Sequence, residues 1–428
     1  ERRECIRMIK RPEEIHEIIR KFSREGYDVI CAGQCITGSL MSESPLDWDL
    51  YTECPQDKIR ELFPEGETIG KRTTRLDYTE FVESTHINEA DHYDGVIADI
   101  ITLEGPIEKQ LEVYDFTCEA TGEHADGTAI DPFNGRKDIK QKLLKPVGNI
   151  DEKIKKNPAI IWKALRYVGL YGFDLSREMY EAIQANAERA YACDKEVILY
   201  EFTSAMIGDH AGKFLKMLKG LELLEAIIGP EGTSSFPREK KDYEKLSDNI
   251  DKTKKIPTRR LGLFYLVFDK NYKKALHFLP HEEDTLFYLE EAKKLCPKLY
   301  FCNNEEVVKN YIAKYGWDKY NFYDKMLKAQ NIVYELDNMK LVGRDEILKV
   351  ILREKQPIFV EDLVIDADDL IEAGITDSRE RADYLMTLLL TPVHKNRWDN
   401  DRDKLLKYAR GFNKSKLKRV FRNVNWMR

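Results

Sequence analysis

The sequence predicts an α+β protein, with a small mixed β-sheet in its first third and an all-helical remainder. Two observations carry this prediction. Before residue 138, short apolar runs of strand length alternate with turns that contain glycine. From Asp138 onward, apolar residues recur almost throughout at the spacing of one helix face. A run of strands followed by a run of helices is typical of α+β folds.

The bulk composition is that of an ordinary folded chain. Its 428 residues are 42% apolar and 34% charged, with a formal net charge of −7. This length favours two or more domains. No apolar run approaches the roughly 18 residues of a membrane-spanning helix, so we expect no membrane partner. The negative charge excludes a wholly basic nucleic-acid coat but not a local basic groove. The eight scattered cysteines form no C-x-x-C pair, which indicates free thiols and a cytoplasmic location.

The first third supplies the predicted sheet. A helix is expected at 13–24, where four apolar residues form a stripe that ends before Gly26. Strands are expected at 27–31, 47–52, 74–82 and 95–102, with a helix at 55–62. Together they predict a mixed sheet of about five strands within roughly the first 145 residues.

Asp47 and Asp49 flank Trp48 at the start of an apolar run. Side chains alternate faces along a strand, so both carboxylates point the same way. Two like charges held side by side are costly unless a cation lies between them. A divalent metal ion that gathers triphosphate oxygens is the usual reason for such a pair, although a lone D-x-D also occurs at solvated strand ends.

A turn that contains glycine precedes this aspartate strand. Gly33 and Gly38 follow the strand at 27–31 and lead into a short helix. Backbone N–H groups in such a turn can bind phosphate. Strand, glycine turn, short helix and a strand with two aspartates together predict a site for a nucleoside triphosphate.

Asp99 is a charged residue inside the apolar strand at 95–102. Two interpretations are open: an edge aspartate that faces water, or a third carboxylate beside Asp47 and Asp49. The second would complete a two-metal site that activates a 3′-hydroxyl and holds the pyrophosphate leaving group.

Helices fill most of the chain after residue 138. The segment 158–171 is a strong helix, with Asn157 as its N-cap and Pro158 in its first turn. The lysine-rich stretch at 231–255 is expected to be a linker or loop. The tail at 414–428 carries six Lys or Arg and no acid. It is either a solvated helix end or a contact for a phosphate backbone.

The order of these features resembles the class II tRNA nucleotidyltransferases, that is, bacterial-type CCA-adding enzymes and their poly(A) polymerase relatives. D-W-D stands where that family has its metal-binding D-x-D, and Asp99 stands in the strand that supplies its third acidic group. Further segments follow in the family's order: YDFTCEA at 114–120 resembles R-R-D-F-T-x-N-A, IDPFNG at 130–135 resembles I-D-P-F-x-G, KNPAIIWKALRY at 156–167 resembles E-D-x-x-R-x-x-R-A-x-R-F, and DLIEAGI at 369–375 resembles D-L-x-x-x-G-I.

The resemblance implies an architecture and partners. It implies a nucleotidyltransferase head at 1–145, a helical neck facing the nucleotide at 146–232, and a helical body and tail that bind RNA at 233–428. It implies Mg²⁺ as cofactor, NTP (ATP, CTP or both) as substrate, and tRNA or another RNA 3′ end as acceptor.

The resemblance also assigns roles to individual residues. The catalytic residues would be Asp47, Asp49 and Asp99, of which the first two hold the metal and the third helps to deprotonate the attacking hydroxyl. A second set would bind the nucleotide: Gly33, Thr37 and Gly38 at the triphosphate, mostly through backbone N–H groups, and Asp115, Asn157, Lys163 and Arg166 around the sugar and base.

Departures from the family pattern fall on its arginines. The basic residue of its glycine turn G-G-x-V-R-D is Thr37 here, and the paired arginines of the next motif are Val113 and Tyr114. The aspartate and arginine that pair with the incoming base are Asn157 and Ile160, and an isoleucine cannot donate to a base. We therefore expect base selection to be altered or relaxed, while the metal carboxylates keep nucleotidyl transfer chemically possible.

Three functions follow as alternatives. The first is a template-independent nucleotidyltransferase that adds nucleotides from NTP to an RNA 3′ end, foremost tRNA, by two-metal phosphoryl transfer. The second is a catalytically silent tRNA- or RNA-binding protein on the same fold, which the lost arginines favour. The third is nucleotide transfer to a non-RNA acceptor, which the long helical body disfavours.

Overall fold

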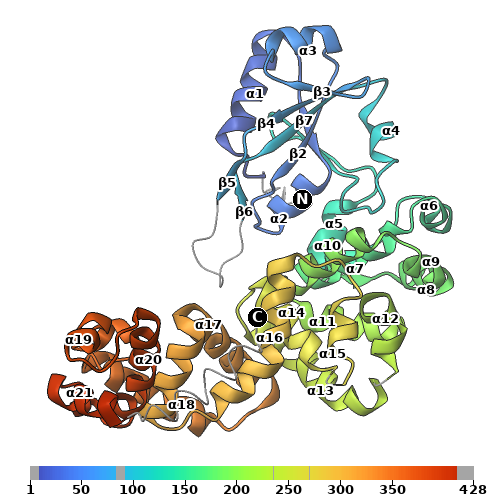
Figure 1. Cartoon of the computed structure of the whole chain (residues 1–428). Helices are drawn as coiled ribbons and strands as arrows, with labels where there is room; N and C mark the ends of the chain where they lie inside the picture. Colours follow the sequence, from blue (N-terminus) through green and yellow to red (C-terminus); the bar gives the residue numbers. More distant parts are fainter. Residues whose placement is uncertain (1–8, 83–91, 235, 269, 412–428) are drawn as a thin grey trace. The chain divides into compact units, whose positions relative to one another are not determined.

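The structure, a computed structural model, describes residues 9–82, 92–234, 236–268 and 270–411. The chain divides into two compact units, Glu1–Leu289 and Glu290–Arg428 (Figure 1). The basic tail at 414–428 lies outside the described residues. The predicted division at residues 145 and 232 is a different partition from these two units, and it stays a prediction.

A seven-stranded mixed sheet lies at the centre of the first unit, in the order β3-β4-β7-β2-β1-β8-β9. Its parallel pair is β2 with β7, and its other neighbours are antiparallel. The strands are β1 (Ile30–Ala32), β2 (Asp47–Thr52), β3 (Glu67–Ile69), β4 (Thr73–Asp77), β7 (Ile97–Thr102), β8 (Gly122–His124) and β9 (Ala129–Ile130).

The predicted α+β class is confirmed, but the sheet is wider than the five strands expected. The exposed β3 and the two-residue β9 are too short or too polar to stand out as apolar runs. The strand predicted at 74–82 is two strands, because β5 (Glu80–Val82) leaves the main sheet and pairs with β6 (His92–Asp94).

The two faces of β2 have different surroundings. Trp48 and Leu50 are buried in a core with Ile18 of α1 (Glu13–Arg24) and Ile59 of α3 (Gln56–Leu62). These two helices lie beside the sheet in Figure 1. Tyr51 belongs to a second, smaller apolar cluster. Side chains alternate along a strand, so Asp49, between Trp48 and Leu50, points away from the main core.

Helices complete the first unit. Helix α7 (Ala159–Tyr171) is buried on most sides and packs against α10 (Lys195–Met206) and α11 (Ala211–Gly220). The other helices that bear on the site or follow it are α2 (Gln34–Leu40), α4 (Ile107–Leu111), α5 (Gly135–Gln141), α6 (Ile150–Lys156), α8 (Arg177–Ala185), α9 (Ala187–Tyr191), α12 (Glu225–Thr233), α13 (Phe236–Asn249), α14 (Pro257–Leu266) and α15 (Tyr272–Leu276). A short parallel pair joins β10 (Leu143–Leu144) to β11 (Asp174–Leu175).

The prediction of a linker or loop at 231–255 is wrong, because α13 occupies most of this segment. Tyr243, Leu246 and Ile250 are fully buried and recur at intervals of three and four residues. This is the spacing of a narrow apolar stripe on a helix. The surrounding lysines and acids hid that stripe in the sequence.

The second unit is helical. It comprises the end of α16 (Glu283–Tyr300), then α17 (Glu305–Tyr334), α18 (Asn338–Arg353), α19 (Ala367–Glu372), α20 (Arg379–Lys395) and α21 (Arg402–Gly411). Gly316 interrupts α17 with a left-handed φ of 82°. Leu370, Leu389 and Leu405 lie in one buried cluster formed by the last three helices. In neither unit does a described helix have the length and apolar character to cross a membrane.

Candidate active site

A row of side chains crosses the sheet at the level of Asp49. The strand registers pair Ala32 with Asp49, Asp49 with Asp99, and Asp99 with Arg75. Residues paired directly across neighbouring strands point to the same face of a sheet. Asp47 lies two residues before Asp49 on β2 and therefore shares that face. The sheet thus brings the three predicted carboxylates together, opposite the core beneath α1 and α3.

Asp99 is paired within the sheet. Arg75 Nε lies 2.8 Å from Asp99 Oδ1, and Nη2 lies 2.7 Å from Oδ2. This bidentate geometry gives a strong, charge-assisted interaction. The charge of Asp99 is therefore balanced by Arg75, and its predicted catalytic role requires Arg75 to release at least one oxygen.

Asp47 and Asp49 are less well compensated. Burial raises the pKa of Asp49 to about 6; the Tyr114 hydroxyl opposes this rise, and the negative charges of Asp99 and Asp47 add to it. Burial also raises the pKa of Asp47. For both carboxyl groups, the cost of burying the ionised form exceeds the compensation that nearby donors and positive charge provide.

The donor set at this face fits a magnesium ion. Across the described residues, no group of three or more His, Cys, Asp and Glu side chains is arranged to hold a metal. Because Arg75 holds both oxygens of Asp99, the carboxylates available at this face are those of Asp47 and Asp49. Mg²⁺ commonly binds through one or two carboxylates, with water and substrate phosphates as its other ligands.

Gly33 brings backbone against Asp49. A Cβ at this position would lie 2.6 Å from Asp49 Oδ2 and 2.8 Å from the Tyr114 hydroxyl. Its φ is also +87°, a conformation that favours glycine. Tyr114 donates its hydroxyl to Asp49 Oδ2 at 2.9 Å and lies 3.0 Å from the Tyr51 hydroxyl. The glycine is therefore needed where turn, tyrosine and carboxylate meet.

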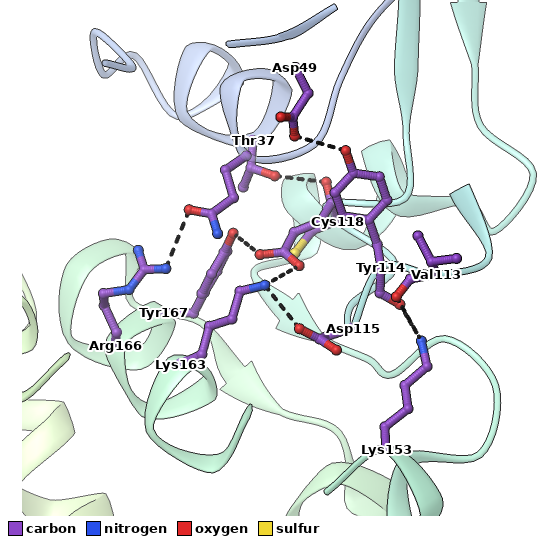
Figure 2. Close-up of polar contacts among 12 residues, drawn as sticks. Thr37, Asp49, Val113, Tyr114, Asp115, Cys118, Lys153, Lys163, Arg166 and Tyr167 are labelled. Atoms are coloured by element: carbon purple, nitrogen blue, oxygen red, sulfur yellow. Dashed lines mark hydrogen bonds and ion pairs between the residues drawn. The ribbon is translucent and has the colours of Figure 1, made fainter. Parts of the chain in front are cut away.

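Lys153 holds the segment that carries Tyr114. Its ammonium donates to the backbone carbonyl of Tyr114 (Figure 2). It also donates to the carbonyls of Glu112 at 3.3 Å and Val113 at 3.5 Å. Backbone carbonyls anchored in this way leave the Tyr114 ring directed at Asp49. The position where the family pattern has an arginine is thus occupied by a fixed hydroxyl donor.

Thr37 and Gly38 do not form the predicted turn. Both lie inside α2 and are buried. Thr37 Oγ1 donates to the Cys118 carbonyl at 2.7 Å, so this hydroxyl is already used (Figure 2). A Cβ at Gly38 would lie 2.9 Å from Pro45 Cγ. Of the glycines predicted in the turn, only Gly33 lies outside α2. The side chain of Thr37 contributes to packing.

Lys163 joins two acids on one side of α7. Its Nζ lies 3.0 Å from Asp115 Oδ2 and 2.9 Å from Glu119 Oε2 (Figure 2). Glu119 is fully buried, and the hydroxyl of Tyr167 donates to its second oxygen at 2.7 Å. Burial alone would lower the pKa of Lys163, but Glu119 and Asp115 more than offset this effect and raise it.

Arg166 links α7 to two other elements. Its Nε lies 2.6 Å from Glu201 Oε2 on α10. Its Nη2 lies 3.4 Å from Gln34 Oε1 at the start of α2. Arg166 therefore lies near the glycine turn, but its charge is paired with Glu201.

Asn157 and Ile160 have different surroundings. Asn157 is exposed, and its Oδ1 accepts from the Ala159 N–H at 3.2 Å. The N-cap of α7 is Pro158, however, and not Asn157 as predicted. Ile160 is buried in α7 and is 3% exposed. Asn157 is thus accessible to a ligand, whereas Ile160 is part of the core.

Several site residues were not found from the sequence: Gln34, Tyr51, Arg75, Glu119 and Glu201. Arg75 carried a usable signal, since a charge in a strand beside an acidic strand favours a cross-strand pair. The others carried none, because their contacts join residues 35 to 132 positions apart.

Known proteins resemble this chain in sequence and in fold. No protein-family model matches the chain. Over 205 residues it is 27% identical to the CCA-adding enzyme of Geobacillus thermodenitrificans, and the aligned region covers 47% of this chain and 51% of that protein. Over 416 residues it is 24% identical to human mitochondrial CCA tRNA nucleotidyltransferase 1, which covers 93% and 90% of the two chains.

The chain is a homologue of the CCA-adding enzymes. It spans about half the length of the Geobacillus enzymes that it matches. Its fold is that of solved CCA-adding enzymes. The Bacillus stearothermophilus enzyme with CTP has a TM-score of 0.70 at 16% identity and covers 96% of this chain and 100% of its own. The Thermotoga maritima enzyme with tRNA has a TM-score of 0.58 at 15% identity, covering 94% and 99%.

Departures from the CCA-adding pattern coincide with the contacts around α7. Glu119 stands where the family pattern has asparagine, Lys163 where it has arginine, and Tyr167 where it has phenylalanine. Lys163 and Tyr167 both donate to Glu119. The substitutions therefore form one connected and satisfied polar cluster rather than scattered losses.

Proposed function

We propose that this protein is a template-independent nucleotidyltransferase that adds nucleotides from NTP to the 3′ end of RNA, with tRNA as the foremost acceptor. One observation carries the proposal: Asp47 and Asp49 share a sheet face, and Asp49 lies against the backbone of Gly33. Two undercompensated carboxylates beside a glycine turn suit a metal-bound triphosphate. Homology to CCA-adding enzymes supports the choice of RNA as acceptor.

Each residue set has a distinct part in this function. Asp47 and Asp49 hold Mg²⁺, and the backbone at Gly33 lies next to the phosphates. Bound Mg²⁺ would neutralise phosphate oxygens and favour the deprotonated 3′-hydroxyl. Asp99 assists deprotonation if Arg75 releases it, and Asn157 faces the nucleotide. Thr37, Lys163 and Arg166 act by building the site, since their polar side chains are engaged within the protein. Gly38 does so by packing closely against Pro45.

ATP and CTP are the proposed substrates. Solved structural neighbours are complexes of CCA-adding enzymes with CTP, with ATP and with tRNA. These ligands belong to those proteins, and shared ancestry extends them to this chain as a proposal.

We assign residues 1–145 to nucleotidyl transfer, 146–232 to the nucleotide-facing neck and 233–428 to RNA binding. The seven described cysteines, all free thiols, support a cytoplasmic location.

A labelling experiment tests this function. Purified protein, Mg²⁺ and labelled ATP or CTP are incubated with tRNA that lacks part of its 3′ end. Wild type should label the tRNA, and Asp49→Asn should reduce the rate by at least about 100-fold because it removes a metal-binding charge. Asp57→Asn, at an exposed position on α3, should match wild type. Equal labelling by wild type and Asp49→Asn would refute the catalytic proposal.

A catalytically silent RNA-binding protein is the second candidate, and the charge pairing in the site favours it. Arg75, Lys163 and Arg166 are all paired with acids. If none releases, the triphosphate meets no unpaired cation among them. Salt-sensitive tRNA binding without any Mg²⁺-dependent thermal shift from the four NTPs would support this candidate over the first.

A further inference from the structure

Gln34 connects the glycine turn to α7. It is the first residue of α2, it is exposed, and it follows Gly33 directly. Because a Cβ on Gly33 would nearly touch the Asp49 carboxylate, Gln34 begins beside the proposed metal site. Its Oε1 accepts from Arg166 Nη2 at 3.4 Å.

Arg166 fixes the direction of the Gln34 amide. A guanidinium only donates hydrogen bonds, so the amide oxygen must face Arg166 and the amino group must face away from it. Arg166 is itself held by Glu201 at 2.6 Å, and it is 8% exposed. The orientation of an exposed side chain is thus set by a partly buried ion pair.

The amino group of Gln34 is available for a ligand. Within the described residues, the structure records no hydrogen bond from its Nε2. This group carries two N–H donors and accepts nothing, so it suits an anionic or carbonyl oxygen. The nearby Thr37 hydroxyl is committed to the Cys118 carbonyl. Lys163 is committed to two carboxylates. Gln34 therefore supplies a donor where the neighbouring polar side chains supply none.

We propose that Gln34 binds the triphosphate of the incoming nucleotide through Nε2, and that Arg166 is a positioning residue that orients the Gln34 amide. This inference rests on the proposed function and names a binding residue for it. The triphosphate is favoured over the base because Gln34 directly follows Gly33, where an added Cβ would lie 2.6 Å from Asp49 Oδ2 and where metal and phosphates would lie. A contact with the base is assigned instead to Asn157, which is exposed between α6 and α7.

Calorimetric titration of the full chain tests the proposal. With Mg²⁺ present, the ligands are ATP, CTP and inorganic triphosphate. Gln34→Glu replaces the donor by a negative oxygen and should weaken all three ligands by about 10-fold or more, whereas Gln34→Ala should weaken them by about 3- to 10-fold. Gln184→Glu, at an exposed glutamine on α8, is the matched control and should change affinity by less than about 2-fold.

Kinetics and a double-mutant cycle separate binding from structure. Gln34→Ala should raise KM for NTP with little change in kcat if its contact is equally strong in ground and transition states. Arg166→Lys should also raise KM, because lysine lacks the fork that reaches both Glu201 and Gln34. Adding Gln34→Ala to Arg166→Lys should then have little further effect, since both remove the same contact.

Three outcomes overturn the inference. If Gln34→Glu leaves the affinity for triphosphate unchanged, the inferred role of Gln34 is refuted while the proposed function stands. A loss confined to one base, with inorganic triphosphate unaffected, assigns Gln34 to the base instead. Failure of wild type to bind any Mg²⁺–NTP refutes the proposed function, and the role of Gln34 falls with it. Unfolding midpoints equal to wild type in each variant show that the fold is intact.

Discussion

Lys163 Nζ lies 2.9 Å from a carboxylate oxygen of Glu119, whose side chain is fully buried. Tyr167 and Asp115 complete the arrangement, so both oxygens of Glu119 and the ammonium have partners. A buried carboxylate of this kind is tolerated only because it is paired and hydrogen-bonded. The pair ties α7 to the segment that follows Tyr114, and it therefore fixes one wall of the site.

Breaking this pair should destabilise the protein. Lys163→Met leaves Glu119 buried without its cation, which should cost about 3 to 5 kcal/mol in free energy of unfolding by urea. The double variant with Glu119→Gln should recover part of that loss, because the uncompensated charge is gone. Lys109→Met, which breaks an exposed pair with Glu112, should cost under about 1 kcal/mol. Equal losses from Lys163→Met and Lys109→Met would show that Glu119 is not dependent on Lys163.

Gly33→Ala should damage both fold and ligand binding. Its Cβ would lie 2.6 Å from Asp49 Oδ2, in addition to the cost of a left-handed φ. Gly70 is a matched control, because its φ is +72° but nothing lies within 4 Å of an added Cβ. Gly70→Ala should cost about 1 kcal/mol for backbone strain alone, and Gly33→Ala should cost clearly more. Thermal unfolding of both variants measures the difference, and equal costs would mean that the close approach to Asp49 is unimportant.

Asp49→Asn should stabilise the metal-free protein in a pH-dependent way. The folded pKa of Asp49 is raised to about 6, above the unfolded value of about 3.9. The folded state therefore holds the proton more tightly, and stability falls as pH rises from about 4 to about 6. At pH 7.5 in EDTA, the variant should be more stable by about 1 to 3 kcal/mol.

The same comparison at low pH provides the control. Near pH 4 the wild-type carboxyl is protonated when folded, so the advantage of Asp49→Asn should disappear. Unfolding curves in urea at both pH values measure it. A gain that persists unchanged at low pH would have to come from packing rather than from the charge of Asp49.

Arg75→Gln should tighten metal binding. Arg75 holds both oxygens of Asp99, and its removal would leave three uncompensated carboxylates on one sheet face. Calorimetry with Mn²⁺ as a Mg²⁺ substitute should show affinity rising by about 10-fold, equivalent to about 1.4 kcal/mol. Arg72→Gln, which breaks an exposed pair with Glu104, should leave affinity unchanged. Weaker binding in Arg75→Gln would mean that Asp99 takes no part in holding metal.

The sequence predicted local features well where a short pattern sufficed. The helix at 13–24 and the strand of Asp47 and Asp49 have the predicted bounds. Each rests on a periodicity within a dozen residues. The pattern was less successful where local signals were weak, as in α13 with its narrow apolar stripe and in the edge strands β3 and β9.

The candidate site was predicted in part for the same reason. Asp47 and Asp49 share a face by alternation alone, so their pairing could be seen in the sequence. Thr37 was expected at the triphosphate, but its hydroxyl faces the Cys118 carbonyl, 81 positions away. No pattern within α2 could indicate which side of that short helix would be buried.

The sequence by itself determined the α+β class, the carboxylate pair and the ancestry shared with CCA-adding enzymes, because these depend on periodicity and on the order of motifs. Only the tertiary structure decided which charges are available. Arg75 pairs with Asp99 on the neighbouring strand. Lys163 pairs with Glu119, which is 44 positions away in the sequence, and Arg166 donates to Gln34, which is 132 positions away. Electrostatic pairing depends on distance in space, and distance in space is set by the packing of segments that are far apart in the chain.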